Sequence, residues 1–168
     1  LTRPGAAAAA GDRIYAVIKG VGASSDGRAK GLTAPLPAGQ QRAVWRAYTQ
    51  AGFSPASVEL FEAHGTGTVA GDKAELETVG RVLETSGAAP GSAAIGSVKT
   101  LIGHTKAAAG VAGLMKIALG LHHKVLPPHA LVEDPNAVFE GEAGPLYLSQ
   151  LPRPWTARAG GARRAGVS

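Results

Sequence analysis

The sequence contains no cysteine and few aromatic residues. The missing thiol excludes disulfide bonds, thiolate metal sites and a cysteine nucleophile among these 168 residues. Only 5% of the residues are aromatic, so the core must be built from small aliphatic side chains. No HExxH or comparable ligand motif occurs in the sequence. We therefore expect no metal site.

Long hydrophobic runs are missing as well. The longest apolar stretch, residues 107–121, is shorter than the ~20 residues that a membrane-spanning helix requires, and it contains Lys116. The first residues lack the charged and leucine-rich regions of a signal peptide. These features predict a soluble, cytoplasmic protein without a membrane span.

Charge is sparse, and its excess is positive. The net charge is +5, and four arginines near the C-terminus supply much of it: Arg153, Arg158, Arg163 and Arg164. They lack the regular interleaving with aromatic residues that is typical of nucleic-acid platforms. We therefore expect a solvated terminus and no nucleic-acid partner.

Apolar patterning predicts strands that alternate with helices. The expected strands cover residues 14–18, 58–63, 93–99 and 146–148, and the expected helices cover about 38–51, 72–84 and 105–123. Residues 1–12 are predicted to be a flexible leader, 20–37 a polar loop, and 165–168 the start of another strand. This order predicts an α/β fold with a parallel or mixed sheet and helices on both faces.

The helix expected at 105–123 is apolar nearly all the way round. A helix without a polar face belongs in the interior of a protein. Three strands and three helices cannot comfortably cover such a helix. The chain is therefore expected to be part of a larger domain.

Two histidines follow neighbouring predicted strands, His64 after the second and His104 after the third. Ligands bind at the carboxyl ends of strands in α/β sheets. Thr105 is expected to cap a helix beginning beside His104, and the helix dipole would keep that imidazole neutral. Two neutral imidazoles can hold one carbonyl or carboxylate oxygen between them. Either histidine alone is better explained as a structural residue, whereas the pair favours catalysis.

Lys99 and Glu75 are the charged residues expected nearest to this position. A lysine at a strand end is most simply a surface residue whose stem lies along the sheet. If Lys99 instead lies beneath the loop, Glu75 is its expected counter-charge. Glu75 also stands three positions after Asp72, which predicts a capping box with Asp72 as the N-cap. Both roles of Glu75 are compatible.

The glycines after His64 allow an alternative. Residues 65–70 match the dinucleotide-binding pattern GxGxxG/A between a strand and a helix. That fingerprint also expects an acidic residue at the end of the next strand, and the sequence there is Ser97-Val98-Lys99. Dinucleotide binding therefore remains a weak alternative.

Two longer motifs resemble those of one enzyme family. Residues 62–68 (EAHGTGT), with Gly71-Asp72 and Glu75, resemble the HGTGT…GD…E motif of β-ketoacyl synthase (ketosynthase) domains. Residues 95–110 (IGSVKTLIGHTKAAAG) are similar to the second signature of that family. The resemblance covers almost the whole chain and is strongest to polyketide and polyunsaturated-fatty-acid synthases.

The resemblance implies a thiolase-like half-domain. Residues 13–168 would form the C-terminal half of a ketosynthase, layered helix/sheet/helix, with a mixed, mostly parallel sheet and a central buried helix. The family's nucleophile is a cysteine in the N-terminal half, and a final glycine-rich loop would follow Ser168. This sequence contains neither, so the chain alone is expected to be inactive.

The implied activity is C–C bond formation by a 3-oxoacyl-[acyl-carrier-protein] synthase-type acyltransferase. A malonyl-type extender on a carrier protein would undergo decarboxylative Claisen condensation with an acyl thioester. The resemblance assigns catalytic histidines, an active-site lysine with its acid, and two threonines lining the phosphopantetheine channel: His64 and His104, Lys99 with Glu75, and Thr66 with Thr68.

The resemblance also implies partners. The chain itself would bind no cofactor, because phosphopantetheine is carried by the acyl carrier protein. The other expected partners are the N-terminal ketosynthase half and a second copy, forming a homodimer. The alternative in another functional class is an inert fragment or interaction module that serves dimerisation or carrier-protein docking.

Overall fold

The computed structural model describes residues 1–25, 36–139, 144–158 and 161–168. Its helices are α1 (Pro4–Ala10), α2 (Pro37–Ala51), α3 (Val69–Thr85), α4 (Lys99–Ile102) and α5 (Ala109–His123), with short 3₁₀ turns η1 (Pro55–Ser57), η2 (Lys106–Ala108) and η3 (Ala137–Phe139). Its strands are β1 (Leu60–Glu62), β2 (Ala93–Gly96), β3 (Val125–Leu126), β4 (Leu146–Leu148), β5 (Arg153–Pro154) and β6 (Ala165–Val167). From α2 onward, the predicted alternation of strands and helices is confirmed.

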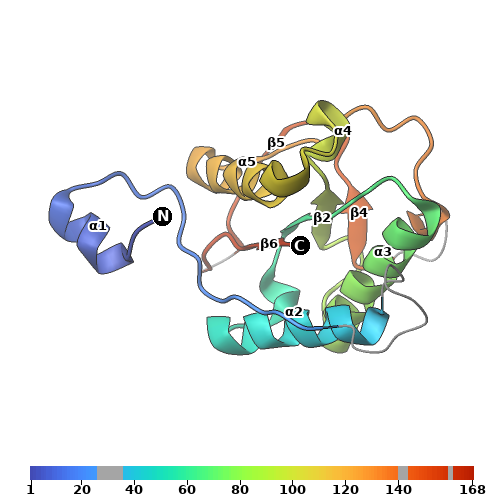
Figure 1. Cartoon of the computed structure of the whole chain (residues 1–168), viewed down its shortest axis with the longest axis horizontal. Helices are drawn as coiled ribbons and strands as arrows, with labels where there is room; N and C mark the ends of the chain where they lie inside the picture. The colour runs from blue at the N-terminus through green and yellow to red at the C-terminus, as the bar shows by residue number, and fades with distance from the viewer. Residues whose placement is uncertain (26–35, 140–143, 159–160) are drawn as a thin grey trace.

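A parallel four-stranded sheet forms the centre, in the order β4-β2-β1-β6. Antiparallel pairing occurs between β3 and β5, which form a separate small ribbon. Helices α2 and α3 lie along one face of the sheet, and α5 lies along the other (Figure 1). Because β1 and β2 run in the same direction, the loops after them meet at one edge of the sheet.

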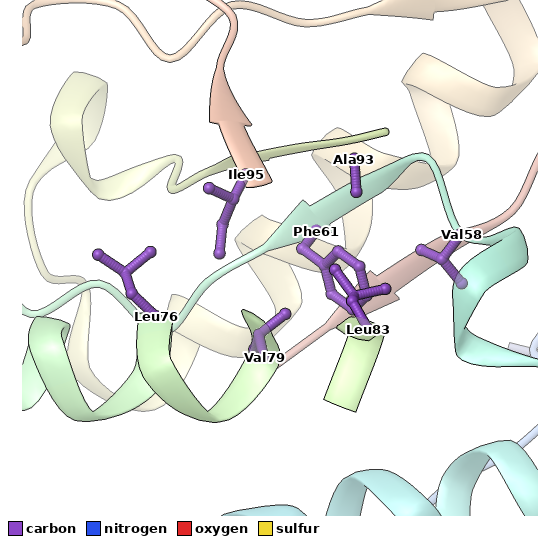
Figure 2. Close-up of a cluster of buried hydrophobic side chains, with 7 residues drawn as sticks. All are labelled: Val58, Phe61, Leu76, Val79, Leu83, Ala93 and Ile95. Atoms are coloured by element: carbon purple, nitrogen blue, oxygen red, sulfur yellow. The ribbon is translucent and has the colours of Figure 1, made fainter. Parts of the chain in front are cut away.

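Successive side chains along each strand point to opposite faces of the sheet, so the hydrophobic core is divided into two clusters, one on each face. Phe61 of β1 and Ile95 of β2 are paired in register and face α3 (Figure 2). Leu60 and Ala94, one position earlier on each strand, face the other way and pack with Ile117 of α5. Glu62 has the parity of Leu60, so the strand places its carboxylate on the α5 side.

Helix α5 is buried along one face only. The buried face consists largely of small residues, namely Ala109, Gly113, Ile117 and Gly120. On the opposite side Val111 and Met115 are each 59% exposed, and Leu119 is 46% exposed. The sequence predicted that this helix is covered on every side. The described chain covers only one of its faces. No helix among the described residues is long and apolar enough to cross a membrane.

The N-terminal region differs from the prediction. The expected leader contains α1, which begins at Pro4, runs through alanines to Ala10 and is capped by Gly11 in the left-handed region. The strand predicted at 14–18 was wrong: this segment is exposed and pairs with no strand of the described chain. It continues along α2 (Figure 1), where a Cβ on Gly20 would lie 2.1 Å from the Ala47 carbonyl oxygen. Residues 26–35 of the predicted polar loop lie outside the described residues.

The C-terminal arginines are part of the fold, so the prediction of a solvated terminus was wrong. Arg158 lies 3.4 Å from Glu59 and donates hydrogen bonds to the carbonyl oxygens of Ala56 and Ser92. Arg164 lies over the ring of Phe53. These arginines fasten the last segment to the amino-terminal ends of β1 and β2. The strand expected at 165–168 is present as β6.

Candidate active site

His64 and His104 meet at the edge where β1 and β2 end. Their ring centroids are 5.8 Å apart, and the ring planes are perpendicular, at 89°. Both side chains are exposed. The structure therefore brings together the two histidines that the sequence placed at equivalent strand ends. Two imidazoles in this arrangement can direct N–H groups to one oxygen atom.

The peptide groups around His64 are held by two charged side chains. Glu75, which is buried in α3, accepts the backbone N–H of His64 at 2.8 Å and that of Gly65 at 3.0 Å. Lys99 donates from Nζ to the carbonyl oxygen of His64. The expected ion pair between Lys99 and Glu75 is absent from the described residues. The two charged groups instead hold the same residue from different sides.

The capping prediction for this loop was also wrong. Helix α3 begins at Val69, and Thr68 is its N-cap, with Oγ1 accepting the N–H of Gly71 at 3.2 Å. Asp72 lies inside the first turn and accepts the N–H of Gly67 at 3.3 Å. Because α3 starts three residues earlier than predicted, Glu75 lies in its second turn. Its carboxylate therefore bonds to the loop that follows β1 and does not cap the helix.

The two threonines lie side by side at the start of α3. The hydroxyl oxygens of Thr66 and Thr68 are 3.3 Å apart, and both residues are exposed. The dinucleotide fingerprint is incomplete here because β2 ends at Gly96 and is followed by Ser97, without an acidic residue.

His104 is held in one tautomer by its own turn. Its Nδ1 accepts the backbone N–H of Lys106 at 3.1 Å, which leaves the ring hydrogen on Nε2. Desolvation by the surrounding protein lowers the pKa of His104, and the charges of Lys106, Lys99 and His64 lower it further. Lys106 adopts the left-handed region, with φ 52°. Neutral imidazole is therefore the favoured form at pH 7.

The helix dipole is not the cause that the sequence suggested. Thr105 makes no side-chain cap, and α5 begins at Ala109, after the short turn η2. The influence of a helix terminus falls off within its first turn. Desolvation and the neighbouring lysines account for the lowered pKa of His104 instead. Lys99 likewise lies in α4 and not at the end of a strand.

Two buried or half-buried groups were missed by the sequence reasoning. Glu62 is 3% exposed and forms an ion pair with Lys116 of α5. His129, which lay in a predicted proline loop, accepts the backbone N–H of Ser97 on Nδ1 at 3.1 Å. Burial lowers the pKa of His129, and Lys116 adds to the shift. The sequence signals for Glu62 were a charge at the end of an apolar strand and its place at the start of the EAHGTGT motif.

A cavity of about 200 Å³ adjoins the loop after β1. Its lining includes Gly65, Glu75, Ser97 and His129. A larger hollow of about 340 Å³ lies at the other end of the strands, beside Glu59 and Trp155. In the described part of the chain, no group of three or more His, Asp or Glu side chains is arranged to hold a metal ion.

Comparisons with known proteins point to one enzyme family. A family model for the β-ketoacyl synthase C-terminal domain matches residues 15–133. The chain is 42% identical over 163 residues to a polyunsaturated fatty acid synthase from Thraustochytrium sp., and 43% identical over 157 residues to polyketide synthase PksL from Bacillus subtilis. Each alignment covers 94% of this chain, but only 6% and 4% of those relatives.

Among solved structures, the chain is similar to a ketosynthase from module 6 of the bacillaene synthase of Bacillus subtilis. The TM-score is 0.92 and the identity 42%, with 99% of this chain and 30% of that chain covered. Ketosynthase domain OzmH KS7 from a Streptomyces oxazolomycin synthase gives a TM-score of 0.87 at 36% identity, over 99% of this chain and 30% of that one.

Proposed function

Since the chain belongs to the β-ketoacyl synthase family and matches its C-terminal domain, we propose that it acts within a complete ketosynthase domain. The thiolase-like α/β fold class predicted from the two motifs is confirmed. The reaction would be decarboxylative Claisen condensation in polyketide or fatty-acid biosynthesis. A malonyl-type extender on an acyl carrier protein would be joined to an acyl thioester.

The observation that carries the proposal is the perpendicular pair of His64 and His104, with ring centroids 5.8 Å apart. In the proposed step, the C–C bond to the extender's carboxylate breaks and carbon dioxide leaves. The electron pair moves into an enolate, whose oxygen would accept N–H groups from both imidazoles. The enolate carbon would then attack the acyl thioester carbonyl, forming the new C–C bond and releasing the thiolate.

The remaining site residues would serve this pair. Lys99 and Glu75 would hold the backbone of His64 from its carbonyl and amide sides, so that the imidazole stays in place. Thr66 and Thr68, both exposed beside the loop, would line the channel for the phosphopantetheine arm that the carrier protein supplies. A pre-set arrangement of this kind reduces reorganisation in the reaction.

The nucleophile must come from residues outside this sequence, which has no cysteine. We therefore propose the N-terminal part of a ketosynthase, an acyl carrier protein and a second copy of the domain as partners, in the cytoplasm. The exposed apolar residues of α5, Val111, Met115 and Leu119, would be covered in that assembly. The same exposed face is the observation that favours a non-catalytic interaction module.

One experiment separates the two functions. The whole chain replaces the matching 30% of the bacillaene module 6 ketosynthase, and release of carbon dioxide from malonyl-carrier protein is measured. His64→Ala and His104→Ala should each lower kcat by about 10²–10³, as expected for the loss of an oxyanion donor. His123→Ala, at an exposed histidine on α5, is the matched control. Decarboxylation near the unsubstituted rate in both variants would overturn the assignment and favour the interaction module.

A further inference from the structure

A buried carboxylate connects the elements that carry the candidate site. Glu62 stands at the end of β1, two positions before His64, and its side chain is 3% exposed. Oε1 accepts the backbone N–H of Val98 at 2.6 Å, and Oε2 accepts Nζ of Lys116 at 2.6 Å. Among the described residues these two oxygens bond to Val98 and Lys116 and form no hydrogen bond with a histidine ring, so we consider Glu62 through the residues that it holds.

Each contact of Glu62 leads to one part of the site. Val98 directly precedes Lys99, whose ammonium group holds the His64 carbonyl. Lys116 lies on α5, the helix that follows the His104 turn. One carboxylate therefore fixes β1, the α4 turn and α5 relative to one another at the sheet edge where the histidines meet.

The fit around this carboxylate is tight. A Cβ on Gly113 of α5 would lie 2.8 Å from Cγ of Glu62 and 3.4 Å from its Oε1. The glycine lets the helix approach the carboxylate closely. Gly110, three positions earlier on the same helix, would meet nothing within 4 Å if it carried a Cβ. The close approach to Glu62 thus occurs at Gly113 and not one turn earlier on the helix.

We propose that Glu62 is a positioning residue for the proposed condensation, on which this inference rests, and that Lys116 is its counter-charge. The Glu62 carboxylate sets the position of the Val98 peptide and hence of Lys99 against His64. Lys116 neutralises that carboxylate where solvent is excluded, and it is 12% exposed. The burial of this ion pair does not by itself mean that it stabilises the fold. Replacing a buried ion pair with apolar residues is often neutral or stabilising.

Two double variants separate positioning from stability, in the same hybrid ketosynthase. Glu62→Gln with Lys116→Met removes both charges but keeps a carbonyl acceptor for the Val98 N–H. Glu62→Leu with Lys116→Met removes the charges and the acceptor. We expect the first to keep kcat within about threefold and the second to lose about 10–100-fold in kcat with KM unchanged, as for a misplaced catalytic group. Both should remain folded.

Gly113→Ala tests the same contact from the helix side. The added methyl group displaces the Glu62 carboxylate, so kcat should fall while KM stays the same. Gly110→Ala, in open space on the same helix, should leave both constants unchanged. Equal kcat values for the two double variants, or for the two alanine variants, would overturn the proposal.

Amide hydrogen exchange at Val98 gives a readout that does not depend on activity. Its N–H should be protected in the unsubstituted protein and in the glutamine variant, and should exchange at least tenfold faster in the leucine variant. If the unsubstituted hybrid releases no carbon dioxide, the proposed function fails, and the exchange pattern still decides whether Glu62 holds this peptide. Unchanged Val98 exchange in the leucine variant would contradict the inference by itself.

Discussion

Glu75 accepts the backbone N–H of His64 over 2.8 Å, although the two residues belong to different elements. Its other oxygen accepts the next N–H along the chain, that of Gly65. The shape of the loop after β1 is therefore determined by a carboxylate in the second turn of α3. The positive φ of 44° at Gly65 allows the bend that presents both N–H groups to one side chain.

Replacing Glu75 should loosen the loop more than it weakens the helix. Glu75→Ala removes both hydrogen bonds to the charged carboxylate, and we expect it to lower the free energy of unfolding by about 1–3 kcal/mol. Glu75→Gln keeps one acceptor and should lose less. Urea denaturation of the whole chain measures both. Glu77→Ala, at an exposed glutamate on the same helix, should change stability by less than about 0.5 kcal/mol. Equal stability of the alanine variants at 75 and 77 would contradict this role.

The charge of Lys106 should shift the pH dependence of the proposed activity. Protonation places a hydrogen on Nδ1 of His104, where it meets the Lys106 N–H, so activity should be lost as the pH falls through the lowered pKa of His104. Lys106→Met removes one cause of that lowering. The pKa should move back toward its ordinary value, about 6.5, and the acidic limb of the kcat/KM profile should move to higher pH.

The matched control for this shift is Lys73→Met. Lys73 is an exposed lysine on α3, paired with Glu77, and is not among the causes of the His104 shift. It should leave the acidic limb in place. If both variants move the limb equally, the effect comes from net charge and not from the neighbour of His104.

Periodicity was enough to predict the parts of the fold that are determined by local pattern. The strand around Phe61, the helix around Val79 and the strand around Ile95 are apolar stretches, and they pack together as one core. The meeting of His64 and His104 was predicted from parallel neighbouring strands, although α4 lies between the end of β2 and His104. These features need only the positions of strand ends, which the sequence indicates.

Features that depend on a distant partner were not predictable in the same way. The segment at 14–18 has the composition of a strand, but composition does not name a pairing partner, and the segment pairs with no strand of the described chain. Lys99 and Glu75 were expected to pair because of their opposite charge, whereas each found a backbone group of His64 instead. Side-chain-to-backbone hydrogen bonds leave no periodic signal in a sequence.

His129 should make the stability of the fold depend on pH. Its folded-state pKa is lowered by burial and by Lys116, so below about pH 6.5 the unfolded chain binds a proton that the folded chain does not. The free energy of unfolding should therefore fall as the pH falls toward the lowered pKa, by up to about 1.4 kcal/mol per pH unit. His129→Asn keeps an acceptor for the Ser97 N–H and does not titrate, so part of this slope should disappear.

Urea titrations between pH 4 and 8 measure that slope. His104, whose pKa is also lowered, should add to this slope, so the double variant with His104→Asn should be flatter still. His123→Asn, at the exposed end of α5, should retain the slope of the unsubstituted chain. If the free energy of unfolding of His129→Asn falls with pH as steeply as that of the unsubstituted chain, the His129 imidazole titrates alike in the folded and unfolded states.

Trp155 should contribute more to stability than the other tryptophan of the chain. It is 2% exposed, and its Nε1–H donates to Oε2 of Glu59 at 2.8 Å. Trp155→Phe leaves that carboxylate oxygen without its donor and removes buried contact area, which should together lower the free energy of unfolding by about 2–4 kcal/mol. Trp45→Phe, at a ring that is 38% exposed, should cost under about 1 kcal/mol.

The two tryptophan variants also decide whether the C-terminal segment is fastened as the structure indicates. Each variant retains one tryptophan, so fluorescence in urea follows unfolding in both. A solvated terminus would make the two substitutions equally mild. If the Glu59–Trp155 hydrogen bond is the cause of the difference, Glu59→Gln should cost less in the Trp155→Phe background than alone, because the indole N–H has already been lost. Additive costs would instead attribute the effect of Trp155 to packing in the core beneath α5.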